Sequence, residues 1–258
     1  MKLPELTYRV WKVWRRDFDV FMKTYKVNFF PPLLEPIFYL VALGIGLGSI
    51  VQAIPGFSSY IQFIAPALLA ISMMNNSFFE CTYGSFVRMY YQKTFDAIIA
   101  TPISIEEVIA GELVWGATRS LISTSIVLVV IGAFGLIGSP FFVLIPFVAF
   151  LAGLTFSSIA MCFTAIAPNI DFFNYPAFLF ITPMFLLSGT FFPIKDLPSF
   201  VQIMAYAFLP LTHAVNLSRG LMVGNLESFL LLSVVWLAVV TPVFFVLSIN
   251  LMKRKLIK

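Results

Sequence analysis

The stretch PIFYLVALGIGLGSIVQAIPGFSSYIQFIAPALLAISMMNNSFF, residues 36–79, contains no charged side chain, and Pro55-Gly56 supplies a turn signal near its middle. A helix needs about 20 mainly apolar residues to cross the hydrocarbon core of a bilayer. The stretch is long enough for two such helices. The sequence therefore predicts two membrane spans joined by a short turn.

Further charge-free windows bring the predicted number of spans to six. Residues 120–170 break at residues 138–140 into two spans, and residues 172–194 and 228–252 supply one span each. The chain is 60% hydrophobic and 11% charged, against roughly 25% charged residues in a soluble domain. This composition excludes a soluble enzyme domain, a secreted disulfide scaffold and a disordered chain. We expect an all-α integral membrane protein with one transmembrane domain over residues 1–258.

The basic residues predict how the spans are oriented. With both termini in the cytoplasm, every Lys and Arg except Lys195 and Arg219 lies on the cytoplasmic side, as the positive-inside rule requires. This orientation needs an even number of crossings. The additional apolar window 197–218 is therefore predicted to dip into the outer leaflet and return, which is possible where the backbone is buried against protein. We expect outer re-entrant helices within residues 197–226.

Residues 1–28 are predicted to form an amphipathic interface helix. Its apolar side chains recur at helical spacing, while the basic ones fall largely on the other side. Basic side chains would meet anionic lipid head groups, and Trp11 and Trp14 would lie in the interface. The alternative is a solvated helix with one packed face. The apolar positions are Leu6, Val10, Val13, Trp14, Phe18, Phe21 and Tyr25.

Catalytic signatures are mostly missing from the chain. A single histidine, His213, cannot form an H-E-x-x-H zinc site. The sequence also lacks a G-x-x-x-x-G-K-[ST] phosphate loop, a G-x-S-x-G elbow and paired aspartates for a metal-bound diphosphate. We therefore expect no metal site and no enzymatic activity of its own. For His213 we expect a structural hydrogen-bonding role, with a pH switch as the alternative.

The second predicted span is unusually polar at its end. Ser72, Asn75, Asn76 and Phe79 can share one helical face, because they are three or four residues apart. Polar groups at membrane depth are costly and usually face a cavity or a partner. We hypothesise that this face lines a translocation path. The alternative is that the amides form hydrogen bonds to neighbouring spans.

Two charges lie close to the same predicted membrane surface. Glu80 ends the second span, and Arg119 enters the third span from the cytoplasmic side. An ion pair between them would spare two charges in apolar surroundings, and breaking it would be costly. We predict a structural pair between Glu80 and Arg119.

The loop over residues 88–112 has helix signals of its own. Asp96 begins a short apolar run, Thr101-Pro102 interrupts it, and Ser104 with Glu107 has the spacing of a capping box. A short helix on the cytoplasmic side could dock into a partner protein. Many loops contain a capped turn, so this pattern alone does not identify the partner.

Several motifs resemble the permease subunits of ABC-2 type ABC exporters. They are FE-x-x-YGSF-x-R at 79–88, QKTFDAIIATPIS at 92–104, GELVWGATRS at 111–120, PMFLLSGTFFPIKDLP at 183–198 and LPLTHAVNLSRGLMVG at 209–224. The chain is most similar to the branch of nodulation lipo-oligosaccharide, drug and polysaccharide exporters. The motifs cover spans two, three and five and the outer segment, in the same order as in the family.

This resemblance implies a six-span half-transporter of the bacterial cytoplasmic membrane that pairs with a second copy and with two ABC ATPase subunits. ATP and magnesium would bind to the ATPase and no cofactor to this chain. The cargo would be an amphipathic molecule such as a lipid-linked saccharide, a lipid or a drug. Membrane lipids are the other expected contact, and no nucleic acid is expected.

The resemblance also implies roles for particular segments. The 88–112 loop would hold a coupling helix that meets the ATPase, and residues 197–226 would be the family's re-entrant outer helices, which contain His213 and Arg219. The coupling contacts would be Thr101, Pro102, Ile103, Ser104, Glu106 and Glu107.

Two other classes of membrane protein remain as alternatives. A secondary transporter or channel acting alone would use charges within the membrane as its ion path. The predicted spans offer few titratable groups, and no inverted repeat is apparent. A membrane-embedded transferase is the third class, and the lack of metal-binding acidic pairs disfavours it.

Overall fold

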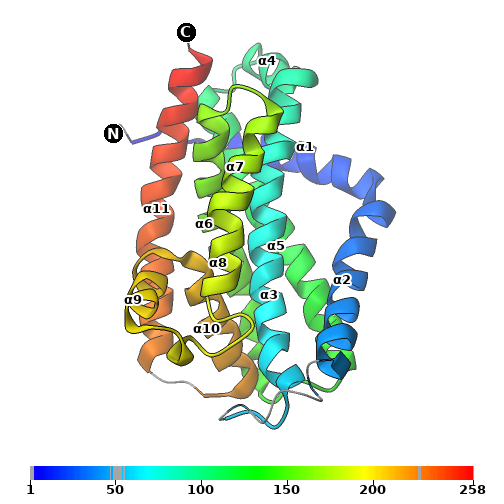
Figure 1. Cartoon of the computed structure of the whole chain (residues 1–258). Coiled ribbons are helices and arrows are strands. Elements are labelled where there is room, and N and C mark those ends of the chain that lie inside the picture. The colour runs from blue at the N-terminus through cyan, green and yellow to red at the C-terminus, as the bar shows by residue number, and fades with distance from the viewer. Residues whose placement is uncertain (1–2, 47, 49–53, 55, 226–227, 258) are drawn as a thin grey trace.

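Long apolar helices run roughly side by side along the molecule (Figure 1). The computed structural model describes residues 3–46, 48, 54, 56–225 and 228–257. Within these residues, six helical segments are long and apolar enough to span a membrane, which confirms the predicted six-span all-α fold. The segments are Tyr25–Gly44, Tyr60–Tyr91, Ile105–Ala133, Pro140–Ile166, Ile170–Leu187 and Leu230–Leu256.

The centre of the bundle is formed by α3 (Tyr60–Phe79), α5 (Ile105–Ala133) and α6 (Ile145–Ile166). Small residues let these helices approach closely. A Cβ atom on Gly116 of α5 would lie 2.3 Å from Ser157 Oγ of α6 and 2.6 Å from Cys81 Sγ. The sixth span, α11 (Ser228–Leu256), packs along α6.

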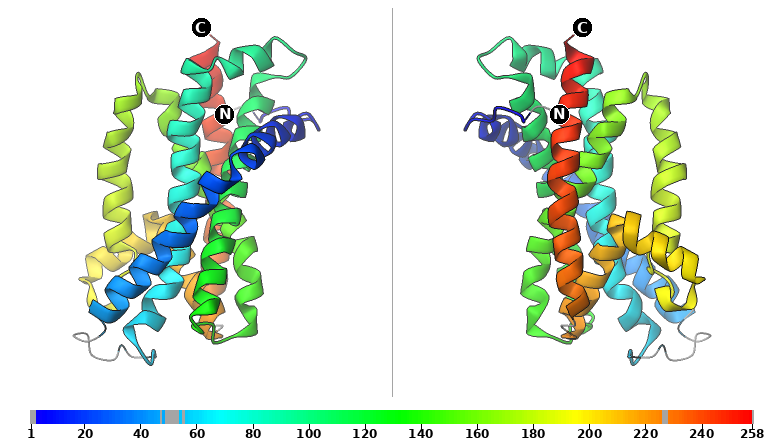
Figure 2. Two further views of the ribbon diagram at one scale, coloured as in Figure 1. Left: turned by 90° about the vertical axis from the view of Figure 1, so that its right-hand side faces the viewer. Right: turned by 90° about the vertical axis from the view of Figure 1, so that its left-hand side faces the viewer.

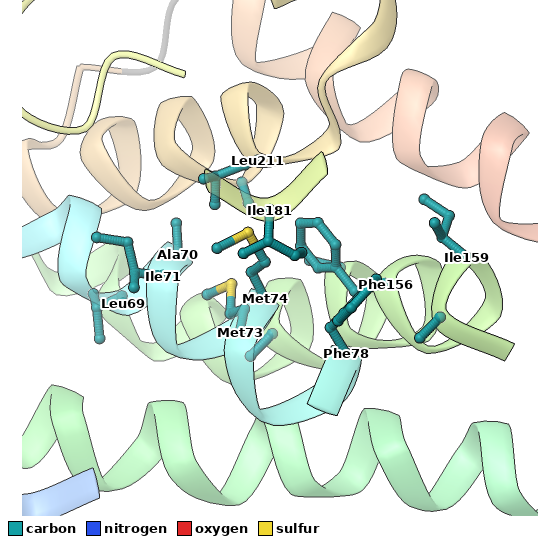
Figure 3. Close-up of a cluster of buried hydrophobic side chains, with 14 of the residues drawn as sticks. Leu69, Ala70, Ile71, Met73, Met74, Phe78, Phe156, Ile159, Ile181 and Leu211 are labelled. Atoms are coloured by element: carbon teal, nitrogen blue, oxygen red, sulfur yellow. The ribbon is translucent and has the colours of Figure 1, made fainter. Parts of the chain in front are cut away.

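Large apolar side chains fill the space between these helices. Figure 3 shows Met73, Met74 and Phe78 of α3 gathered with Phe156 of α6 and with Leu211. All five side chains are fully buried. The centre of the bundle is therefore packed with side chains.

Two spans stand at the periphery. The first span, α2 (Tyr25–Gly46), contains three prolines and is mostly exposed. The fifth span is made of η4 (Ile170–Phe173), α7 (Asn174–Pro176), η5 (Ala177–Ile181) and α8 (Thr182–Leu187), and it forms the outer column in both views of Figure 2. Bilayer lipid or another protein chain must cover these apolar surfaces.

The predicted re-entrant helices are α9 (Ser199–Phe208) and α10 (Pro210–Val223), which meet at an angle of 91°. Pro210 at the start of α10 has no backbone N–H, so the chain can turn here without losing a helical hydrogen bond. Both helices lie toward the end of the molecule opposite the two termini (Figure 1).

The end that carries both termini, called here the terminal end, holds α1 (Val10–Lys23) and α4 (Thr94–Ile99). The π-helical turns η1 (Glu80–Gly84) and η2 (Val87–Tyr91) continue α3 as far as Tyr91. The connection to α5 is therefore only residues 92–104, shorter than the loop over 88–112 that the sequence suggests. The remaining short helices are η3 (Pro140–Leu144) and η6 (Ile194–Asp196).

Candidate functional site

A cluster of ion pairs joins three helices at the terminal end, with Arg88 of η2 at its centre. Arg88 Nη1 lies 2.8 Å from Glu80 Oε1, Arg88 Nη2 lies 2.6 Å from Glu112 Oε2 of α5, and Arg88 Nε lies 3.9 Å from Asp17 Oδ1 of α1. One guanidinium group thus contacts carboxylates that come from three separate parts of the chain. Its planar set of donors suits this arrangement, whereas a lysine would supply only a point charge.

Glu112 is fully buried and is satisfied on both of its oxygens. Ser85 Oγ donates a hydrogen bond to Glu112 Oε2 at 2.7 Å, and Arg16 Nη2 donates one to Glu112 Oε1 at 3.1 Å. Sequence reasoning missed Arg88 and Glu112 as a pair, although both lie in the motifs that carry the family resemblance. The available signal was that a charge in apolar surroundings requires a partner.

Glu80 and Arg119, for which the sequence predicts an ion pair, lie 3.4 Å apart, measured from Arg119 Nε to Glu80 Oε2. Glu80 has closer partners, because Arg88 reaches it at 2.8 Å and Trp115 Nε1 donates a hydrogen bond to it at 3.0 Å. The two residues therefore belong to a larger network. Within the described residues, no three His, Cys, Asp or Glu side chains are grouped so that they could hold a metal ion.

Asp17 gives this cluster a titratable group close to neutral pH. It lies on α1, outside the six spans, and its side chain is 4% exposed. Burial and the nearby charge of Glu112 raise the pKa of Asp17 to about 7, although Arg88 and Arg16 act in the opposite direction. The folded chain therefore binds a proton on Asp17 at a pH where the unfolded chain has lost it.

We expect the free energy of unfolding to decrease as the pH rises from about 4 to about 7, because the raised pKa favours the folded state only while Asp17 is protonated. The slope should be at most ~1.4 kcal/mol per pH unit. Thermal unfolding in detergent over this range measures it. Asp17→Asn should flatten the profile, whereas the exposed control Asp171→Asn should not, and identical profiles for the two variants would contradict the assignment.

The predicted capping box is present at the start of α5. Ser104 Oγ accepts from the backbone N–H of Glu107 at 3.2 Å, and Glu107 Oε2 accepts from the backbone N–H of Ser104 at 2.8 Å. Thr7 Oγ1 also donates to the Glu107 carboxylate, which is buried. Glu107 therefore attaches the N-terminal end of α5 to Ser104 and to Thr7.

Glu106 links the N-terminal end of α5 to segments near both ends of the chain. Its carboxylate accepts a hydrogen bond from the backbone N–H of Glu5 at 2.7 Å and forms an ion pair with Lys253 of α11. Arg9 adds a third link, because its guanidinium donates to the backbone oxygen of Pro102. Both termini thus hold the connection between α4 and α5 in place.

The tip of α4, here residues 96–104, is largely exposed at the terminal end. Thr101, Pro102 and Ser104 are exposed, while Ile103 is half-buried. Asp96, Ala97 and Ala100, which sequence reasoning did not select, are also exposed beside them. Of the six predicted coupling residues, Thr101, Pro102 and Ser104 are exposed at this tip. Glu106 and Glu107 instead form contacts within the chain.

The polar face of α3 consists of Ser72, Asn75, Asn76 and Phe79. All four side chains are partly exposed, whereas those of Met73, Met74, Ser77 and Phe78 are buried. Asn76 Nδ2 donates to the backbone oxygen of Ser72 at 3.0 Å, so within the described part of the chain this amide bonds to its own helix and not to a neighbouring span. Asn75 has no hydrogen-bond partner among the described residues.

His213 and Arg219 anchor the re-entrant helix α10. The His213 ring stacks on Trp236 of α11 with the ring centroids 4.4 Å apart, and its Nδ1 lies 3.1 Å from Ser233 Oγ. Arg219 lies over the ring of Phe63 of α3 at 3.8 Å and donates to the backbone oxygens of Phe63 and Thr190, both at 3.3 Å. Through these contacts the two side chains hold α10 against α11 and α3.

Known proteins align with almost the whole length of the chain. A model of the ABC-2 type transporter family matches residues 8–223. Nodulation protein J of Sinorhizobium fredii is 32% identical over 255 residues, which is 99% of this chain and 97% of that protein. Nodulation protein J of Rhizobium meliloti is 36% identical over 245 residues, covering 95% of this chain and 92% of that protein. The inner membrane transport permease YadH of Escherichia coli is 26% identical over 194 residues, covering 74% and 73%.

Proposed function

Because the chain belongs to the ABC-2 type transporter family, we propose that it is the permease subunit of an ATP-driven exporter that moves an amphipathic cargo across the bacterial cytoplasmic membrane. The family match over residues 8–223 carries this proposal. The permease works with an ABC ATPase, which binds ATP and magnesium, and adds no catalytic group of its own. The functional complex contains two copies of this chain and two ATPase subunits.

The exposed tip of α4 is the surface that docks with the ATPase. It lies at the terminal end, which in this proposal faces the cytoplasm. A movement of the tip would reach the spans as a rigid displacement, because Ser104 and Glu107 fix the start of α5 and Arg88 ties α5 to α1 and α3. Nucleotide binding would thus shift the population of two arrangements of the spans.

The cargo path follows the polar face of α3. Asn75 offers an amide with no hydrogen-bond partner among the described residues, and Phe79 offers an apolar ring on the same face. An amphipathic molecule can use both kinds of contact. A second copy of the chain would close the path on the side left open by a single copy.

Replacing Asn75 and Asn76 together by alanine should reduce ATP-driven transport by roughly ten-fold, because the path loses two polar contacts with its cargo. Assembly and melting temperature should stay near those of the parent, since neither amide bonds to another helix among the described residues. Asn250→Ala on α11 is the matched control, because this amide also bonds within its own helix. Transport at the parental rate by the double variant would exclude this face.

The proposed assembly is tested by native mass spectrometry of the tagged chain, gently extracted from its own host. We expect two copies of the chain together with two ATPase subunits that contain a phosphate loop. A chain that lacks a nucleotide-binding partner, after controls for dissociation, would contradict the proposal. Acid-driven transport by the purified chain alone would then identify it as a secondary transporter.

A further inference from the structure

The first span carries a carboxyl group near its middle. Glu35 lies within the span Tyr25–Gly44, its side chain is exposed, and it forms no hydrogen bond or ion pair with any described residue. The carboxylates at the terminal ends of the second and third spans are all paired: Glu80, Glu106, Glu107 and Glu112. An ionisable side chain within the membrane is costly and usually marks a functional path.

The backbone around Glu35 is also more polar than that of an ordinary span. Pro31, Pro32 and Pro36 lie within α2 and have no N–H, so they cannot donate to the carbonyls of Val27, Asn28 and Pro32 four residues earlier. Such backbone is tolerated at membrane depth where it lines a cavity or is buried in protein. The carboxyl group and the interrupted helix thus give α2 a polar segment in the bilayer.

Two cavities meet at Glu35. On its inner side is a small cavity of about 20 Å³ between α2 and α3, which Tyr39 and Ser72 also line. On its outer side is a groove of about 510 Å³ whose remaining lining is mostly apolar: Pro31, Leu34, Phe38, Tyr39, Ala42 and Leu43. Glu35 therefore lies where the polar face of α3 adjoins an apolar groove on α2.

We propose that Glu35 holds the head group of an amphiphile whose apolar chain lies along the groove on α2, and that it selects head groups that donate hydrogen bonds. This inference rests on the proposed export function and specifies the class of cargo. A carboxylate accepts hydrogen bonds, so an amine or a set of sugar hydroxyls satisfies it, whereas a phosphate is repelled.

Two other occupants would leave the carboxyl group without a favourable partner. A lipid tail in the groove would cover Glu35 with hydrocarbon, which cannot form a hydrogen bond. A second copy whose two-fold axis passed through Glu35 would bring two like carboxyl groups together. An amphiphile satisfies the apolar side chains of this face of α2 and the carboxyl group at the same time.

The test uses the permease with its ATPase in nanodiscs of phosphatidylcholine. Three photoreactive probes share one hexadecyl chain and differ in the head group, which is an amine, a maltoside or a phosphate. Mass spectrometry identifies the labelled peptides, and a titration gives the half-saturating concentration of each probe. We expect the amine and the maltoside to label residues 31–43, and the phosphate to require roughly ten-fold higher concentrations.

Glu35→Gln should raise the half-saturating concentration of the amine roughly ten-fold and change that of the maltoside little, because an amide still accepts hydrogen bonds. Glu35→Leu should weaken both, and the exposed carboxylate variant Asp171→Asn should weaken neither. An unchanged amine titration for Glu35→Gln, or parental labelling confined to other spans, would overturn the site.

ATP hydrolysis and probe movement measured in the same nanodiscs separate the two proposals. Labelling that depends on Glu35 without ATP-driven movement would count against export and for the site. ATP-driven movement with labelling that does not depend on Glu35 would support export and overturn the site.

Discussion

Arg88→Gln should lower the free energy of unfolding by about 3–5 kcal/mol, the usual cost of removing one partner from a buried charge pair. Arg88 contacts carboxylates on η1, α1 and α5, and Glu112 is fully buried. Without Arg88, these carboxylates lie close together with less positive charge among them. Arg119→Gln should cost less, because Arg119 contacts only Glu80 in this cluster, at 3.4 Å.

Fluorescence-detected gel filtration after heating in detergent measures this loss. Arg254→Gln is the matched control, since it removes the same group from an exposed position at the terminal end. Arg88→Lys should recover part of the stability by restoring the charge without the planar set of donors. If Arg88→Gln melted at the temperature of the Arg254→Gln control, the cluster would not hold the helices together.

The double variant Ala97→Arg/Thr101→Arg should reduce the ATP hydrolysis that the permease stimulates by at least roughly ten-fold. Both positions are exposed at the tip of α4, so the change should leave the fold intact. The two long charged side chains should prevent the ATPase from packing closely against this tip. Glu107→Arg is a less informative choice, because Glu107 is buried and holds Ser104 and Thr7.

The measurement compares ATP hydrolysis by the purified complex with that of the ATPase alone, together with the amount of ATPase that co-purifies. Ile257→Arg adds the same side chain to another exposed position at the terminal end and serves as the control. Full stimulation by the double variant would place the docking surface elsewhere.

The six spans follow from the sequence because apolar length is a local property. The ends of the second and third spans do not follow from the sequence, because a charge-free window ends at its first charged residue. Glu80, Arg88 and Glu112 nevertheless stay within long helices, because each has a partner of opposite charge from another part of the chain. Such pairs depend on tertiary contacts that helical periodicity cannot predict.

The candidate sites were predictable to different extents. The capping box of Ser104 and Glu107 follows from spacing alone, whereas the links from Glu106 to Glu5 and Lys253 depend on the fold. Glu35 was missed for a specific reason. The charge-free window begins at residue 36, so this carboxyl group looked like a boundary, although the helix starts ten residues earlier at Tyr25.

The ion pair between Glu106 and Lys253 joins residues that are 147 positions apart in the sequence. During synthesis the first spans and the tip of α4 emerge from the ribosome long before α11 does. The link can form only after the sixth span has entered the membrane. In the proposed complex, the ATPase would therefore meet an α4 tip supported by the Glu106–Lys253 pair only in chains that carry all six spans, so incomplete translation products would not assemble with it.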